Sequence, residues 1–252
     1  MKLIAFASRN WKELIRDKLN LIFGIVFPVI LLLLLTAIQA NIPVSLFTLD
    51  QLTPGVAVFG LSFVSLFSGV LIAKDRTSSF MLRLFISPLH PGEFILGYIL
   101  PLLPMAAAQI LLCFLVAGIL GLPLTVNVLW SALILLPASV LFIALGLLCG
   151  CLLTDKQVGG ICGALLTNIT AWLSGTWFDL NLVGGVFSGV ANALPFVHAV
   201  EAGLAALHGN LAGVFPHLWW VLGYGVAFLG LAVWVFNRRM NMWLFLRGKM
   251  GW

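Results

Sequence analysis

The chain has 252 residues, of which 62% are hydrophobic and only 8% are charged, and its formal net charge is +5. An ordinary soluble domain has about 25% charged residues, so this composition excludes one, because too few polar residues remain to cover the apolar surface. It indicates a protein whose main solvent is lipid, and the positive charge then points to anionic lipid headgroups, with no role for nucleic acid.

Residues 1–19 are expected to form a short amphipathic helix at the membrane interface. Its apolar residues recur at helical spacing: Ile4, Ala7, Trp11, Leu14 and Ile15. The opposite face carries Arg9, Lys12, Glu13 and Arg16. A basic polar face beside an apolar one is typical of a helix that lies flat on a membrane. A basic anchor with no further role is the alternative.

Six stretches almost free of charge follow: Leu21–Ala40, Gly55–Ala73, Phe94–Leu120, Leu129–Leu153, Val158–Trp177 and Leu218–Asn237. Each is close to the roughly 20 residues that a helix needs to cross the hydrocarbon. A helix satisfies its own backbone hydrogen bonds, which lipid cannot do. The sequence therefore predicts an all-α polytopic membrane protein, a single transmembrane domain over residues 1–252 with six transmembrane helices.

The basic residues predict the orientation of these helices. All 13 Lys and Arg residues fall in the N-terminal segment, after the second stretch, between the fourth and fifth, or after the sixth. The three other loops contain none. The positive-inside rule predicts that both termini lie in the cytosol. We expect a multi-pass protein of the cytoplasmic (inner) membrane.

Two connecting segments have patterns of their own. Residues 74–91 are charged at the start, then apolar and basic, and contain Pro88 and Pro91. We expect a short cytosolic helix along the membrane there, because proline prevents it from continuing into the third span.

Residues 178–217 are too apolar for a solvated external loop, and glycines and prolines divide them into pieces too short to cross. We expect short re-entrant helices that dip into the outer leaflet.

The search for catalytic chemistry finds no candidate. The chain has no GxxxxGK[ST] phosphate-binding loop and no HExxH zinc motif, and its six stretches contain no pair of carboxylates. The four cysteines lie within or at the ends of the stretches and match no zinc spacing. We therefore predict no catalytic residue and no metal site, and an energy source on another chain.

Two stripes of hydroxyl side chains cross the apolar stretches. One consists of Ser62, Ser65 and Ser68, and the other of Thr167, Thr170 and Ser174. Such stripes usually bridge neighbouring helices, and the alternative is that they line a substrate path. The matches Gly146xxxGly150 and Gly159xxxGly163 are no more frequent than 25 glycines produce by chance.

Two local motifs resemble a known family. The segment after the second stretch begins Lys74-Asp75-Arg76-Thr77 and later contains Ser87-Pro88. The end of the fifth stretch reads SGTWF over residues 174–178, followed by the LPF of residues 194–196. With the order of helices, these motifs resemble the permease subunit of ABC-2-type ABC exporters.

This resemblance implies that two copies of the chain, or a copy and a similar chain, pair with two separate ABC ATPase subunits. The chain itself would need no cofactor, since ATP and Mg would bind to the partner. The ATPase-coupling residues would be Lys74, Asp75, Arg76, Thr77, Met81, Arg83, Leu84, Ser87 and Pro88. The path would run along both hydroxyl stripes. The cargo would be hydrophobic or amphiphilic: a drug, a peptide antibiotic, a lipid or a lipid-linked glycan. A stand-alone sodium-coupled carrier is the alternative.

Overall fold

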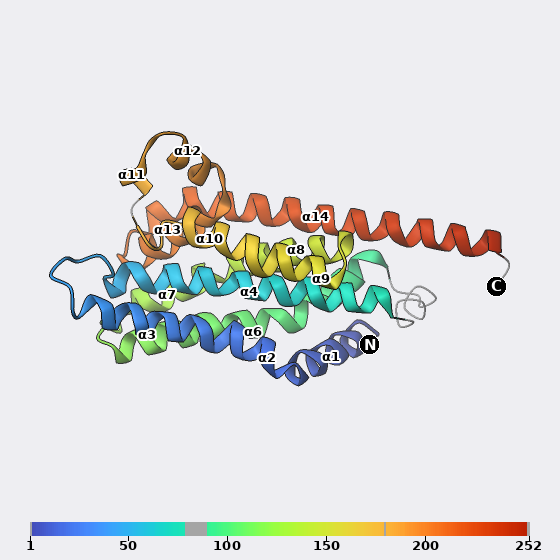
Figure 1. Ribbon diagram of the computed structural model, residues 1–252, viewed down its shortest axis with the longest axis horizontal. Coiled ribbons are helices and arrows are strands. Elements are labelled where there is room, and N and C mark those ends of the chain that lie inside the picture. Colours follow the sequence, from blue (N-terminus) through green and yellow to red (C-terminus); the bar gives the residue numbers. More distant parts are fainter. Residues whose placement is uncertain (1, 79–89, 179, 251–252) are drawn as a thin grey trace.

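The computed structural model describes residues 2–78, 90–178 and 180–250, and within these ranges it is helical with no strand. The long helices run side by side along the long axis of an elongated bundle (Figure 1). The all-α polytopic fold is confirmed.

The chain enters through α1 (Lys2–Arg16), and the first predicted span is one continuous run of α2 (Lys18–Leu21), the π-helix η1 (Ile22–Val26) and α3 (Phe27–Gln39). The next spans are α4 (Leu49–Thr77) and α6 (Pro91–Ile119). The fourth is divided into α7 (Val126–Ile134) and α8 (Leu136–Leu152), with Pro137 in the first turn of α8. Proline is tolerated there because the first turn has no internal partner for its N–H.

Among the described residues, five helical segments of 22 residues or more are long and apolar enough to cross a membrane, and they match five of the six predicted stretches. The remaining stretch, 158–177, forms a shorter run of α9 (Asp155–Val158), the π-helix η2 (Gly159–Leu166) and α10 (Thr167–Leu173). It is not among the five. A capping box between Thr154 and Gln157 begins this run, which satisfies backbone N–H groups that a helix start leaves open.

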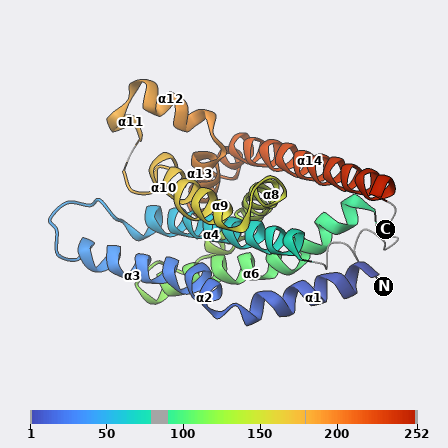
Figure 2. The same ribbon diagram turned by 45° about the vertical axis from the view of Figure 1, so that its right-hand side comes forward.

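The predicted external segment forms α11 (Leu180–Val183), α12 (Gly185–Ala193) and α13 (Pro195–Leu207). The axes of α12 and α13 meet at 79°, the geometry of a broken span or a re-entrant loop. The last helix, α14 (Leu211–Met250), is 40 residues long. It extends past the bundle at the end where both termini lie (Figures 1 and 2).

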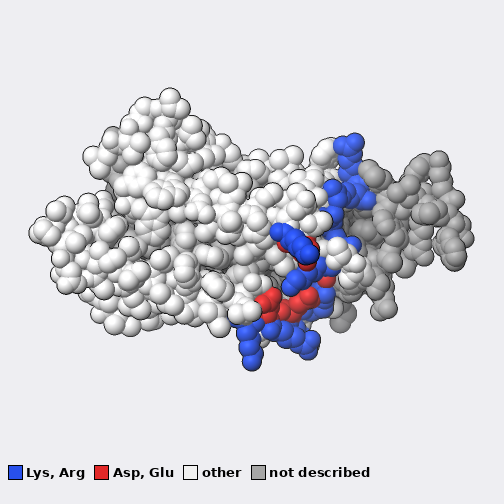
Figure 3. Space-filling model, in the orientation of Figure 1, with Lys and Arg blue, Asp and Glu red and all other residues white. Residues whose placement is uncertain are grey.

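Charge is strongly segregated along the bundle. On the face shown in Figure 3, Lys, Arg, Asp and Glu gather in a band near the end that holds the two termini. We call this end, formed by α1, the last turn of α4, the last turn of α8 and α9, the charged end. The start of α1 and the end of α14 thus lie at the same end of the bundle (Figure 1).

Helix α4 is the core of the bundle, and it approaches α8 at glycine positions. A Cβ on Gly146 of α8 would overlap the Ser65 carbonyl oxygen and Ser68 Oγ, and one on Gly150 would overlap Gly69 of α4. The interpretation of Gly146xxxGly150 as chance was wrong, because these glycines let two helix backbones come into contact. A Cβ on Gly159, by contrast, would meet no other atom within 4 Å among the described residues.

Candidate functional site

The charged end is organised around a buried carboxylate in the last turn of α4. Asp75 is 2% exposed. Arg9 of α1 donates to both of its oxygens, from Nη1 at 2.6 Å and from Nη2 at 2.7 Å. The Tyr98 hydroxyl of α6 donates to Asp75 Oδ2 at 2.9 Å. One carboxylate therefore joins three helices through charge-assisted hydrogen bonds, which are stronger than neutral ones.

Helix α1 packs on α6 along a line that the sequence interpretation missed. Phe6, Asn10 and Leu14 are spaced four residues apart and all are buried. The Phe6 ring occupies the space beside Gly97. It also meets the Tyr98 ring edge-on, with 5.0 Å between the two ring centroids. Asn10 Nδ2 donates to the Gly97 carbonyl at 3.0 Å. The expected apolar side chains Ile4, Trp11 and Ile15 remain 39–70% exposed, as a face turned toward lipid would be.

The ion pair keeps Arg9 charged although it is partly buried. Burial alone would lower the pKa of Arg9, but the hydrogen bond and the negative charge of Asp75 outweigh it and raise the pKa. Arg9 also reaches Glu13 Oε2 at 2.6 Å, one turn along α1. The Arg9 guanidinium therefore stays charged in this contact.

The other predicted coupling residues that the structure describes differ in their surroundings. Arg76 Nη1 donates to the carbonyls of Gly150 at 2.5 Å and Leu153 at 3.2 Å, so it caps the C-terminal end of α8. Lys74 is half exposed, with Nζ 3.7 Å from Asp17 Oδ2. Thr77 is exposed, and its hydroxyl donates to the Lys74 carbonyl. Of these four, Lys74 and Thr77 have exposed side chains, whereas the side chains of Asp75 and Arg76 are occupied within the bundle.

The rest of the predicted coupling segment lies outside the described residues: Met81, Arg83, Leu84, Ser87 and Pro88. Their roles stay predictions.

The hydroxyl stripe of α4 is buried in contacts between helices. Ser62, Ser65 and Ser68 are all fully buried. Ser68 Oγ donates across to the Ile143 carbonyl of α8 at 3.0 Å, whereas Ser62 bonds only to Phe59 within its own helix, as far as the described residues show. Ser65 Oγ faces the Cys162 thiol and has no well-formed hydrogen bond within the described ranges. In the single chain, this stripe holds helices together at Ser68 and leaves one hydroxyl unused at Ser65.

The second stripe behaves similarly. Thr167 Oγ1 donates to the Cys162 carbonyl at 3.1 Å. Ser174 Oγ and Thr176 Oγ1 share a hydrogen bond of 2.6 Å in the turn after α10. Thr170 is fully buried, and its Oγ1 has no partner in the part of the chain that the structure describes. Ser65 and Thr170 are therefore the two stripe hydroxyls with hydrogen-bonding capacity to spare.

A family model described as ABC-2 type transporter matches residues 1–208. The chain belongs to this family. The match covers more than four fifths of its length and includes α1 to α13. As an ABC-2 type protein, the chain is the multi-pass membrane component of an ABC transporter and is not itself the catalytic subunit. No curated protein matches its sequence.

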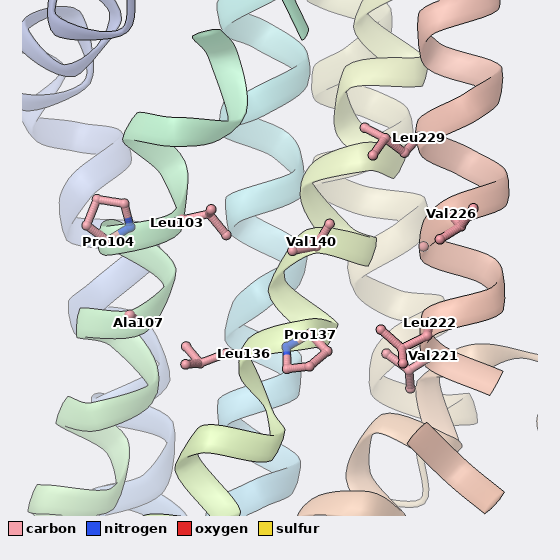
Figure 4. Close-up of a pocket in the computed structure, with 11 residues that line it drawn as sticks. Leu103, Pro104, Ala107, Leu136, Pro137, Val140, Val221, Leu222, Val226 and Leu229 are labelled. Carbon is pink, nitrogen blue, oxygen red and sulfur yellow. The ribbon is translucent and has the colours of Figure 1, made fainter. Parts of the chain in front are cut away.

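This ABC-2 permease also has an apolar groove among α6, α8 and α14 (Figure 4). Its volume is about 570 Å³, and Pro104 and Pro137 are both in its wall. All of its lining side chains are apolar, among them Leu103, Val221 and Val226. It suits a hydrocarbon chain, but none of its lining residues carries a polar side chain that would orient one ligand over another.

Proposed function

We propose that this ABC-2 permease exports a hydrophobic or amphiphilic cargo, driven by a separate ABC ATPase subunit that binds ATP and Mg. Two copies of the permease, or one copy and a similar chain, would enclose the path. The complex would lie in the cytoplasmic membrane with the charged end and both termini in the cytosol. All described Lys and Arg residues lie at or beyond that end, which supports this orientation by the positive-inside rule.

The observation that carries the proposal is the Arg9–Asp75–Tyr98 contact at the start of the predicted coupling segment. Asp75 is four residues before residue 79, where the undescribed part of that segment begins. A force applied to this segment would act on the end of α4, and the buried ion pair would transmit it to α1 and α6. Asp75 and Arg76 are then positioning residues that act within the chain, while Lys74 and Thr77 are available to touch the ATPase.

The proposed path runs along α4, η2 and α10, next to Ser65 and Thr170. Thr170 Oγ1 is buried without a partner among the described residues, and Ser65 Oγ has only a weak contact with the Cys162 thiol, so both would gain free energy from another polar group. A cargo molecule or a second copy of the chain would supply that group. The low polarity of this region supports a cargo that is itself largely apolar.

The proposal is tested by reconstituting the purified complex in vesicles and measuring uptake of lipophilic dyes and drugs into inverted vesicles. Export by this account requires ATP and Mg and persists without any ion gradient. Uptake driven by a sodium gradient without ATP would instead establish the stand-alone carrier.

A further inference from the structure

A second groove, distinct from the proposed path, lies at the charged end where α1 meets α2. Its volume is about 480 Å³. Asp17 separates the two helices with a non-helical backbone, and its side chain accepts from the backbone N–H of Asn20 to start α2. The break turns α2 away from α1 and leaves the groove open against α4.

The floor of this groove is apolar and is formed by one face of α4. Phe67, Val70 and Leu71 line it, and Lys74 continues the same face one turn later. Residues at spacings of three, four and seven share one side of a helix. The floor therefore leads from the apolar middle of α4 to a cationic rim at the charged end.

The rim carries more positive charge than its own carboxylates neutralise. Arg16, Lys18 and Lys74 line it together with Glu13 and Asp17. Glu13 is paired with Arg9, and Asp17 with Lys74.

Arg16 and Lys18 are exposed, and neither forms an ion pair with any residue that the structure describes. Two cations thus stand beside an apolar floor, and each basic residue at a membrane surface adds attraction for anionic lipid.

We propose that this groove binds an anionic phospholipid of the adjacent leaflet. Arg16 and Lys18 hold the phosphate of the headgroup, and the first methylenes of an acyl chain lie on Phe67, Val70 and Leu71. The charged groups stay at the membrane surface while the chain follows α4 inward, which is the layout of an amphiphile in a bilayer. This inference depends on the membrane location of the chain and not on the ATPase or the cargo.

The test is native mass spectrometry of the full-length permease in a neutral detergent, titrated with phosphatidylglycerol or with phosphatidylcholine of the same acyl chains. We expect phosphatidylglycerol to bind at least about tenfold more tightly. The double variant Arg16→Gln/Lys18→Gln should lose on the order of 30-fold in phosphatidylglycerol affinity and little in phosphatidylcholine affinity.

The matched control is Lys12→Gln/Lys156→Gln, which removes the same charge at two sites outside the groove. It should bind phosphatidylglycerol within about twofold of the unmodified chain, because surface charge at a distance is largely screened. Equal losses in the two double variants, or equal affinity for the two lipids in the unmodified chain, would overturn the proposal.

A third variant tests the floor. Val70→Trp fills the floor and should weaken the binding of both phosphatidylglycerol and phosphatidylcholine. Inorganic phosphate at millimolar concentration should not displace bound phosphatidylglycerol. Displacement by phosphate alone would mean that the groove is an anion site without a lipid floor. Unchanged lipid binding in folded Val70→Trp protein would contradict the proposed position of the acyl chain.

Discussion

Arg9 and Asp75 lie 66 residues apart in sequence, and two parallel hydrogen bonds of 2.6 and 2.7 Å join them. The guanidinium comes from a helix at the entrance of the chain, and the carboxylate from the end of the most buried span. This pair fixes the geometry of the charged end, because each partner is anchored on a different element. A bidentate arginine–carboxylate pair constrains orientation as well as distance.

Breaking this pair should be costly. Asp75→Asn removes the buried negative charge, but Arg9 is one-third exposed and keeps its contact with Glu13, so we expect a loss of about 1–3 kcal/mol. We expect a clear fall in the thermal unfolding temperature of the detergent-solubilised permease, together with loss of ATPase stimulation by cargo. Arg9→Lys should be intermediate, because it keeps the charge but not the bidentate contact.

A double variant separates the ion pair from other effects of these substitutions. Arg9→Met/Asp75→Asn removes both charges and keeps an acceptor for the Tyr98 hydroxyl, so it should be more stable than Asp75→Asn alone, which leaves Arg9 without its main counter-charge. If the double variant were as unstable as the sum of its single variants, the two residues would not interact as the structure indicates.

The contact between α4 and α8 gives a sharper prediction of stability. Gly146→Ala places a methyl group against the Ser65 carbonyl and should destabilise the chain by about 1–3 kcal/mol, as overpacking does. Gly159→Ala is the matched control, because it belongs to the other GxxxG sequence and meets open space. Similar unfolding temperatures for the two variants would contradict the close helix contact.

Substitution of Arg76 should lower the free energy of unfolding, whatever its effect on coupling to the ATPase. Arg76→Ala removes the cap on α8, and a partly buried cation at a helix C-terminus contributes about 1–2 kcal/mol. Lys74→Ala removes a half-exposed side chain and should change stability by less than about 0.5 kcal/mol. Urea unfolding of the two variants measures this difference directly, and equal stability would argue against the cap.

The orientation is tested by labelling introduced cysteines in intact cells. Asn210→Cys, between α13 and α14 at the end opposite the charged end, should react with a membrane-impermeant maleimide from outside. Lys156→Cys in α9 should react only after the membrane is permeabilised. The reverse pattern would mean that the charged end faces outward. The four native cysteines require the unmodified chain as a background control.

Much of the fold was predictable because hydropathy and charge are local signals. A stretch such as Gly55–Ala73 shows its membrane span in its own composition, and the basic residues mark one end of the bundle. Whether the short segment 155–173 crosses the membrane was harder to predict, because Asp155, Lys156 and Asn168 lower its mean hydropathy.

The candidate site was less predictable because it depends on contacts between distant residues. Asp75 belongs to the motif Lys74-Asp75-Arg76-Thr77, but no neighbouring residue in the sequence indicated that Arg9 and Tyr98 would form hydrogen bonds with it. Asn10 interrupts the apolar line of α1, so the buried face of that helix was missed, although its spacing from Phe6 and Leu14 was visible. Gly146 and Gly150 could be separated from chance only by the helix that packs against them.

The central claim is that this permease works with a separate ATPase, and co-purification tests it most directly. The tagged chain is isolated from its native membrane in mild detergent and analysed by mass spectrometry and an ATPase assay. This account predicts a stoichiometric ABC ATPase and Mg-dependent ATP hydrolysis, with hydrolysis no longer stimulated by cargo in the Arg83→Glu variant. A permease that purifies alone from several detergents, without ATPase activity, would contradict it.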